Sequence, residues 1–447
     1  MADTNMDAHT DTNIREKIKE TYVVLTVGGE GTRMYPLTLN CPKPLIDMCN
    51  YPIIKRISEI FIVQGCRKFI FASKGYENNV RIKEVMGLGR DLVKRMQSRN
   101  IEISDLEFNY TPKYDDKGSA DATRFAAKFF NVRTDMIIVG GDQIMDINID
   151  SMLKFHYEKN ALMTIGLVKV DDVSQYGVVE LNENGKIVKF VEKPKQNETK
   201  SNLANIGVYI LSPKIREIFE KEDAADKIKD FGKDLIPYLV NNNYEIYGFS
   251  HEYYWNDVGT PDRYLQTTAD ILNGKLRNIK FNKNEERHDG IWIKEDTYNR
   301  LMFKIKNKKI LLQKPLRIGK NCDIYENVTI ENSVIGDSVI IRNGCKIANA
   351  VICDFTYIGE NCTVNKCIIG MHTTIGKNSR IDADVNEFVA TKSRIPVIGD
   401  DVEIYPNSLI GPGKRVANIY NAHKVLATGK FSTLGMDAKS VYFIEKE

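Results

Sequence analysis

Short apolar runs alternate with amphipathic stretches over residues 22–272. The stretches between the runs carry apolar residues at helical spacing, for example Pro52–Gln64 and Ser119–Phe130. This alternation is typical of repeated βα units around one sheet. It predicts a mixed, mostly parallel, Rossmann-like α/β domain with strands at Tyr22–Val27, Lys68–Ala72, Met136–Val139, Met163–Val168 and Ile206–Ile210.

The last third of the chain has a different period. Aliphatic residues recur there at spacings of six, six and five, so each group of three begins seventeen residues after the previous one. Three short strands per coil, each pointing one aliphatic side chain inward, explain this period and predict a left-handed parallel β-helix. An antiparallel β-sandwich is the alternative, but it would show period two. The inward positions are Ile318, Ile324, Ile330, Ile335, Ile341, Ile347, Ile352, Ile358, Val364, Ile369, Ile375 and Ile381.

Two further features of the repeat bear on its geometry. Glycine often follows the inward aliphatic residue, and we expect it to supply a corner free of Cβ strain. Small residues such as Cys322, Cys345 and Cys362 lie four places after that residue, which suits a narrow interior. The register breaks at 382–396 and resumes at Ile398, so we expect an inserted loop there. The glycines are Gly319, Gly336, Gly359, Gly370, Gly376, Gly399 and Gly411.

Length and composition favour a folded chain of more than one unit. The 447 residues exceed one ordinary core, and 42% are hydrophobic and 28% charged. We divide the chain into a polar N-terminal extension (1–20), the α/β domain (21–275), a connector with a few short strands (276–314), the β-helix (315–415) and a C-terminal tail (416–447).

The charge balance and the N-terminal sequence argue against nucleic-acid binding, membrane association and export. There are 63 Lys and Arg against 60 Asp and Glu, so no global field favours nucleic acid or a membrane surface. Residues 1–20 lack the apolar core of a signal peptide, and no run is long enough to span a membrane, so we expect a cytoplasmic protein. The eight Cys form no CxxC pair, and we interpret them as buried thiols.

A glycine-rich segment follows the first predicted strand. It contains Gly28, Gly29, Gly31, Thr32 and Arg33, and Lys43 comes ten residues later. Three glycines in four positions let the backbone approach a phosphate or a base, and the two cations add fixed positive charge. The segment lacks the Gly-Lys-Ser/Thr of a P-loop and the third glycine of a dinucleotide fingerprint. It therefore predicts a phosphate site of another kind.

Asp142 follows the predicted strand at 136–139 and two further glycines. Ligands of open α/β sheets bind at the carboxyl ends of the strands, so this carboxylate is a candidate ligand for a metal ion. A helix cap or a turn is the alternative for an Asp in this position.

Over residues 22–415 the chain resembles sugar-1-phosphate nucleotidyltransferases. The resemblance lies in Gly-Gly-x-Gly-Thr-Arg-x-x-Pro-Leu-Thr followed by Pro42-Lys43-Pro44, and in motifs that come later in the family's order. These are Tyr176-Gly177-Val178-Val179, Val191-Glu192-Lys193-Pro194, Asn205-Ile206-Gly207-Val208-Tyr209 and Trp255-Asn256-Asp257-Val258-Gly259-Thr260. A β-helix tail is also similar to that of many members.

The resemblance implies a reaction between a nucleoside triphosphate and a sugar-1-phosphate that releases pyrophosphate. An oxygen of the sugar phosphate attacks the α-phosphorus, so charge must be neutralised on both sides. It implies that Asp142 and Asp257 hold Mg²⁺, which prefers oxygen ligands and keeps some of its waters. It also implies catalytic roles for Arg33, Lys43 and Lys193, nucleotide contacts from Gly28, Gly29, Gly31, Thr32, Gly118 and Ser119, and sugar contacts from Gly177, Glu192 and Asn205.

The chain departs from the family pattern where the base is expected. It reads Gly118-Ser119-Ala120-Asp121-Ala122 in place of Gly-Thr-Ala-Gly-Ala, and Asn109-Tyr110-Thr111 stands where a Gln or Glu is common. GTP, UTP and dTTP therefore stay open as donors, and mannose-1-phosphate and glucose-1-phosphate as acceptors. The coil arrangement resembles that of eukaryotic-type guanylyltransferases, which favours mannose with GTP slightly.

Two alternatives concern activity. The chain would be a catalytically inactive regulatory homologue if its charged motif residues were lost, but they are intact. Acetyl transfer by the β-helix would need a general base, and His372 and His423 are the candidates. A stack of coils also has flat faces suited to self-association, so we expect a homo-oligomer.

Overall fold

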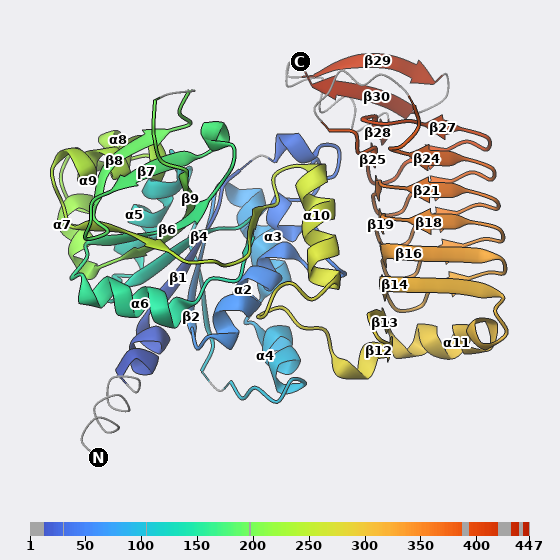
Figure 1. The fold of residues 1–447 in the computed structure, drawn as a ribbon, viewed down its shortest axis with the longest axis horizontal. Helices are drawn as coiled ribbons and strands as arrows, with labels where there is room; N and C mark the ends of the chain where they lie inside the picture. The colour runs from blue at the N-terminus through green and yellow to red at the C-terminus, as the bar shows by residue number, and fades with distance from the viewer. Residues whose placement is uncertain are drawn as a thin grey trace. The chain divides into compact units, whose positions relative to one another are not determined.

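A computed structural model describes residues 13–29, 31–103, 105–195, 198–386, 393–418, 431–437 and 441–446. The chain divides into two compact units (Figure 1). Unit 1 comprises Met1–Gly29 and Ile57–Trp255, and unit 2 comprises Glu30–Arg56 and Asn256–Glu447. Residues 13–20 of the predicted N-terminal extension are helical, while its first twelve residues lie outside the described part.

Unit 1 is built on a mixed sheet with strand order β10-β6-β9-β4-β1-β2-β3. The pairs β1/β2, β1/β4, β2/β3 and β6/β10 are parallel, and β9 is antiparallel to both of its neighbours. The mixed, mostly parallel sheet is thus confirmed. The strands are β1 (Tyr22–Val27), β2 (Lys68–Ser73), β3 (Glu107–Tyr110), β4 (Met136–Gly140), β6 (Met163–Lys169), β9 (Leu203–Leu211) and β10 (Ile246–Ser250).

All five strands expected from the apolar runs are present, with bounds that differ by three residues or fewer. Val24, Ile70 and Ile138 lie in register on β1, β2 and β4 and share one core with alanines of α5. Small alanines let that helix approach the sheet closely. The helices are α2 (Ile53–Val63), α3 (Tyr76–Met86), α4 (Arg90–Gln97), α5 (Ser119–Phe129), α6 (Ile149–Glu158), α7 (Arg216–Phe219), α8 (Ala224–Lys227), α9 (Ile236–Asn241) and the single turns η3 (Val173–Gln175), η4 (Pro213–Ile215) and η5 (Phe231–Leu235).

A hairpin of β7 (Gly177–Leu181) and β8 (Ile187–Glu192) extends the sheet alongside β9. Gly177 pairs with Glu192 at the open end of this hairpin, so two of the quoted motifs face each other across it. A short strand, β5 (Gln143–Met145), follows β4.

Unit 2 contains the parallel β-helix, whose strands stack as ladders in Figure 1. Ile318 is in register with Ile335, Ile352, Ile369 and Ile398 along one ladder, which is the seventeen-residue period with one interruption. The strands are β14 (Ile310–Ile318), β15 (Asp323–Ile324), β16 (Val328–Ile335), β17 (Ile340–Ile341), β18 (Lys346–Ala348), β19 (Val351–Ile352), β20 (Tyr357–Ile358), β21 (Thr363–Asn365), β22 (Ile368–Ile369), β23 (Thr374–Ile375), β24 (Arg380–Asp382), β25 (Val397–Ile398), β26 (Glu403–Ile404), β27 (Leu409–Ile410) and β28 (Arg415–Asn418).

The interruption is the expected inserted loop. β22 pairs with β25 although 29 residues separate Ile369 from Ile398, so the chain leaves the coil and returns to it. Residues 387–392 of this loop lie outside the described part. In the tail, the hairpin of β29 (Phe431–Asp437) and β30 (Val441–Lys446) pairs antiparallel with β28.

The expected role of the repeat glycines is wrong. Gly319, Gly359 and Gly376 do not have positive φ; the corners at positive φ are occupied mainly by residues such as Asn321 (56°) and Asn361 (57°). A Cβ on Gly359 would instead lie 2.6 Å from the backbone nitrogen of Lys377 in the next coil. Glycine is therefore required because the coils stack closely, and asparagine, which tolerates the left-handed region, makes the turns.

The small residues inside the coils make a regular set of bonds. The thiols of Cys322, Cys345 and Cys362 donate to the carbonyl oxygens of Gly336, Gly359 and Gly376, at 3.0, 2.9 and 3.2 Å. All eight Cys are free. Six are buried as predicted, whereas Cys41 and Cys353 are half-buried. Burial raises the pKa of the Cys322 thiol to about 12, which keeps it protonated and able to donate.

Helix α11 (Glu295–Lys306) was not expected in the connector. It buries Leu301 in the β-helix core, and its Thr297 hydroxyl donates to the carbonyl of Gly319 at 2.8 Å. The remaining elements of unit 2 are η1 (Thr32–Met34), η2 (Lys43–Leu45), α10 (Pro261–Leu272), η6 (Lys283–Glu285), β12 (Glu286–His288) and β13 (Ile291–Ile293), and β11 (Trp255–Asp257) begins at the last residue of unit 1.

Candidate functional site

In unit 2 the glycine-rich segment forms a tight turn beside Lys43. Gly31 has φ 65°, and a Cβ there would lie 3.2 Å from the Cβ of Lys43 and 3.0 Å from Thr38. The Thr38 hydroxyl donates to the Gly31 carbonyl at 2.9 Å, and Thr32 begins η1 directly after the turn. Only glycine fits this conformation and this close approach.

Asp257 is surrounded by basic side chains of the same unit. Its carboxylate lies 3.2 Å from the guanidinium of Arg263, 3.7 Å from the Lys43 ammonium and 3.9 Å from the Arg33 guanidinium. The Lys43 side chain is only 7% exposed, whereas that of Arg33 is 53% exposed. Three of the predicted site residues, Arg33, Lys43 and Asp257, thus form one charged cluster.

In unit 1, Gly28 and Gly29 leave the end of β1. A Cβ on Gly28 would lie 3.4 Å from the Cβ of Lys74 and 3.7 and 3.8 Å from the carboxylate oxygens of Asp116. Among the described residues, no atom lies within 4 Å of the Cβ position of Gly29. This strand end is therefore a surface that a ligand can approach closely.

Gly118 and Ser119 begin α5 against a loop of the same unit. Gly118 has φ 153°, and a Cβ there would lie 2.6 Å from the carbonyl oxygen of Lys229. The Ser119 hydroxyl donates to the carboxylate of Asp230 at 3.1 Å and accepts from the backbone N–H of Phe231 at 3.3 Å. The orientation of the Ser119 hydroxyl is therefore fixed by contacts within the protein.

The Glu192 carboxylate lies between two glycines. One of its oxygens would be 2.9 Å from a Cβ on Gly177 and 2.7 Å from a Cβ on Gly232, so both glycines make room for it. Burial raises the pKa of Glu192, while the charges of Lys193 and Lys233 oppose that shift. A half-buried carboxylate of this kind can accept hydrogen bonds from hydroxyl groups.

Lys193 and Asn205 are the other two residues predicted on the sugar side. Lys193 has an exposed side chain and φ 50°, and its backbone N–H donates to the carbonyl of Tyr176 at 3.0 Å. The Asn205 amide accepts from Gly207 at 2.8 Å and donates to the Tyr209 hydroxyl at 2.9 Å. These bonds fix the orientation of the amide, which retains capacity for one further donated bond.

Asp142 belongs to unit 1 and follows β4 as predicted, partly exposed. Among the described residues, no group of three or more His, Cys, Asp and Glu is arranged to hold a metal ion. A magnesium ion that shares substrate phosphates needs fewer protein ligands. Asp142 and Asp257 fit that requirement, since both carboxylates are hard oxygen donors that are partly open to solvent.

Four side chains near these positions were not predicted as site residues. The Gln143 Oε1 and Trp255 Nε1 atoms are buried and have no hydrogen-bond partner among the described residues. A Cβ on Gly207 would lie 2.5 Å from the Gln143 amide nitrogen, so this glycine makes room for Gln143. Asp230 and Asp116 are the other two. Gln143 stands directly after Asp142, and Trp255 opens a quoted motif, so the sequence contained a signal for Gln143 and Trp255 but none for the two aspartates.

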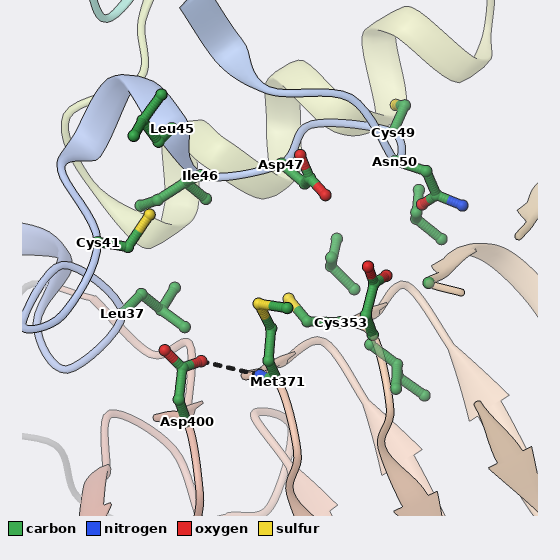
Figure 2. Close-up of a pocket in the computed structure, with 15 residues that line it drawn as sticks. Leu37, Cys41, Leu45, Ile46, Asp47, Cys49, Asn50, Cys353, Met371 and Asp400 are labelled. Carbon is green, nitrogen blue, oxygen red and sulfur yellow. Dashed lines mark hydrogen bonds between the residues drawn. The ribbon is translucent and has the colours of Figure 1, made fainter. Parts of the chain in front are cut away.

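Unit 2 also has a cavity of about 230 Å³ that none of the predicted site residues lines (Figure 2). Its wall combines apolar side chains with the carboxyl groups of Asp47, Asp354 and Asp400. The Asp400 carboxylate accepts from the backbone N–H of Met371 at 2.8 Å. The cavity is thus separate from the charged cluster around Asp257.

Two histidines, His372 and His423, were considered above as general bases for acetyl transfer. His372 is exposed, and its ring stacks on Phe355 with centroids 4.8 Å apart. His423 lies outside the described residues. Among the described helices, none has the length and apolar character that a bilayer crossing requires.

Comparisons with known proteins agree with this organisation. Residues 22–274 match the nucleotidyl transferase family, and residues 308–418 match the GMPPB C-terminal domain. The chain is 32% identical over 279 residues to a glucose-1-phosphate adenylyltransferase of Clostridium novyi, covering 60% of this chain and 70% of that protein. It is 26% identical over 327 residues to a UTP–glucose-1-phosphate uridylyltransferase of Synechocystis, covering 72% and 80%.

A solved structure is also similar in part. It is that of a protein named as a glucose-1-phosphate thymidylyltransferase from Bacillus anthracis, in complex with sucrose. The match has a TM-score of 0.48 and 23% identity, and it covers 59% of this chain and 98% of that one.

Proposed function

We propose that this chain, which belongs to the nucleotidyl transferase family, transfers a nucleoside monophosphate from a nucleoside triphosphate to glucose-1-phosphate and releases pyrophosphate. The sugar rests on the two relatives described above, both of which are named for glucose-1-phosphate. We therefore favour glucose-1-phosphate over mannose-1-phosphate as the acceptor.

The observation that carries the proposal is the cluster of Arg33, Lys43 and Asp257 beside the glycine turn. In the proposed reaction Gly28, Gly29, Gly31 and Thr32 let the triphosphate approach the backbone. Arg33 and Lys43 bind its phosphates and stabilise the leaving pyrophosphate. The burial of Lys43 strengthens its effect, because a charge in a low-dielectric setting is screened less than one in water.

The acceptor side of the proposal uses unit 1. Lys193 binds the phosphate of the incoming sugar and directs its oxygen toward the α-phosphorus. Glu192, Asn205 and the backbone at Gly177 bind sugar hydroxyl groups. The unpartnered Gln143 Oε1 and Trp255 Nε1 atoms support a polar ligand nearby, because buried polar atoms of folded proteins are nearly always hydrogen-bonded.

We also propose that Asp142 and Asp257 hold Mg²⁺. The ion would neutralise charge on the phosphates during transfer. For Asp257 this places a divalent ion among three basic side chains, so substrate phosphates must bring the balancing negative charge. We accordingly expect the ion to bind tightly only together with the triphosphate.

Self-association through unit 2 remains part of the proposal. Large apolar side chains are exposed on its β-helix and on α11, among them Phe303, Leu311 and Leu409 at more than half of their full exposure. Burial of such side chains would favour a homo-oligomer. A monomeric mass by light scattering at micromolar concentration would exclude it.

Pyrophosphate release from every pairing of ATP, GTP, UTP, CTP and dTTP with glucose-1-phosphate and mannose-1-phosphate, in Mg²⁺, tests the function. We expect the highest kcat/KM with glucose-1-phosphate, and no release with any pairing would overturn the proposal. Lys43→Ala should lower kcat/KM by about 10²- to 10³-fold, as when one preorganised charge is deleted. Lys128→Ala, an exposed lysine of α5, is the matched control and should have no effect.

A further inference from the structure

The loop at 111–118 meets the glycine segment at the edge where strands β1, β2 and β3 end. These strands are neighbours in the sheet. The backbone N–H of Lys74, after β2, donates to the carbonyl of Val27, and that of Gly75 donates to the carbonyl of Tyr114. The Asp116 carboxylate thereby comes within 4 Å of the Cβ position of Gly28, where the backbone is open to a ligand.

Asp116 is buried, with 7% of its surface exposed, yet it has no counter-ion of its own. Among the described residues no cation lies within ion-pair distance, and Lys74 acts on it from farther away. Burial raises the pKa of Asp116, and backbone N–H groups of Gly118 and Asp116 oppose that shift. A buried carboxylate is costly unless it is paired with donors, so this one fits a ligand that brings N–H groups.

The residues that replace the usual Gln or Glu are occupied elsewhere. The Asn109 amide donates to Glu107, the Tyr110 hydroxyl donates to the carbonyl of Gly87, and the Thr111 hydroxyl donates to the carbonyl of Phe71. Their polar groups are thus held by the protein itself. Asp116 is the acidic side chain of this loop that is buried beside Gly28.

We infer that Asp116 reads the nucleobase and selects guanine, so that GTP is the donor in the function proposed above, on which this inference rests. Guanine presents N1–H and the exocyclic amine side by side, which matches the two oxygens of one carboxylate. Adenine, cytosine, uracil and thymine each place an acceptor next to the donor on that edge. That acceptor would face the second oxygen of Asp116 and be repelled.

Exchange of Asp116 for Asn gives a specific test. The Asn amide keeps one acceptor and gains a donor, which suits xanthine, whose carbonyl replaces the guanine amine. We expect wild-type kcat/KM to be highest with GTP. Asp116→Asn should lower kcat/KM for GTP by about 10- to 100-fold, as for loss of a bidentate base contact, and should raise the XTP/GTP ratio by at least that factor.

The matched control is Asp115→Asn, which makes the same chemical change at the exposed neighbouring residue and should leave the ratio unchanged. A wild-type enzyme that prefers any other triphosphate over GTP overturns the inference while the proposed function stands, and this measurement needs no variant. An XTP/GTP ratio that Asp116→Asn leaves unchanged also overturns it. Absence of pyrophosphate release with every triphosphate overturns the proposed function itself.

Discussion

Asp142 and Asp257 lie far apart in the sequence and in different units, so a shared magnesium ion is the strictest prediction that the proposed function makes. We consider Asp142→Asn, Asp257→Asn and the double variant. Each exchange removes one anionic oxygen ligand but keeps the side-chain shape. If both carboxylates ligate one ion, either exchange weakens the same metal site. The double variant should then be only slightly less active than the less active of the two single variants.

Asp257→Asn should also lower the stability of the fold, because Asp257 contacts the basic side chains of the charged cluster. The Arg33 contact is long and exposed, so its loss should matter little. Arg263 would lose its contact at 3.2 Å and the buried Lys43 its contact at 3.7 Å, for which together we expect a cost of about 1–3 kcal/mol in the free energy of unfolding. Thermal unfolding without ligands measures this cost separately from activity.

The assay is the Mg²⁺ dependence of kcat/KM for pyrophosphate release. We expect each single variant to lose about 10²-fold or more and to require higher Mg²⁺, as for removal of a preorganised electrostatic contact. Losses that multiply in the double variant would mean that the two carboxylates act independently, and the shared ion would then be refuted. An unchanged Mg²⁺ dependence in both single variants would refute it as well.

Two further predictions concern unit 2. Gly359→Ala should lower the free energy of unfolding by about 1–3 kcal/mol, because its Cβ would meet the backbone of the next coil at 2.6 Å; the exposed Lys377→Ala should not, and equal denaturant midpoints would contradict the stacking argument. Burial and the charge of Asp354 raise the pKa of Asp47, at the cavity wall, to about 7, against the opposing charge of Arg56. The charge of Asp337 raises this pKa further, and the charge of Lys55 opposes the shift. The folded state therefore keeps the proton to higher pH than the unfolded state, so the free energy of unfolding should fall by about 3 kcal/mol as pH rises from about 4 to about 7, and Asp47→Asn should flatten that dependence in urea titrations.

The strands and the coils could be predicted because their signals are local and repeated. The apolar runs of β1 and β4 are buried on both faces, and the inward Ile positions recur at a fixed period. Helix α11 was missed because it stands alone in a Lys- and Asn-rich stretch and is defined by its contact with the first coil. Its buried Leu301 belongs to the β-helix core, most of whose residues lie after the connector.

The glycine error has a different origin. Sequence shows that a glycine recurs, but a recurring glycine has two explanations, a positive φ or a close neighbour. At Gly31 the structure shows both, whereas at Gly359 it shows only the second. Which explanation holds depends on the coil above, seventeen residues away, and no local pattern reports that distance.

The candidate site residues that sequence analysis named lie inside short motifs. It missed residues on loops that approach those motifs only in the folded chain. Arg33, Lys43 and Glu192 belong to compact motifs. Asp116 and Asp230 instead reach Gly28 and Ser119 through loops whose path only the fold determines. Base selectivity is therefore the part of the function that the sequence left open and the loop at 111–118 now addresses.

The segment that bears Arg33 and Lys43 is held by the β-helix within unit 2. The Asn50 amide donates to the carbonyl of Ile335 at 2.8 Å, and the half-buried Arg415 guanidinium donates to the carbonyl of Tyr35 at 3.0 Å. A Cβ on Gly399 would touch the Pro36 ring at 2.9 Å. Three separate coils thus contact the backbone directly after Arg33 and beyond Lys43. Catalysis by fixed charges depends on their preorganisation, so in the proposed function the β-helix would help to hold Arg33 and Lys43 in place for the phosphates, a role separate from the proposed self-association.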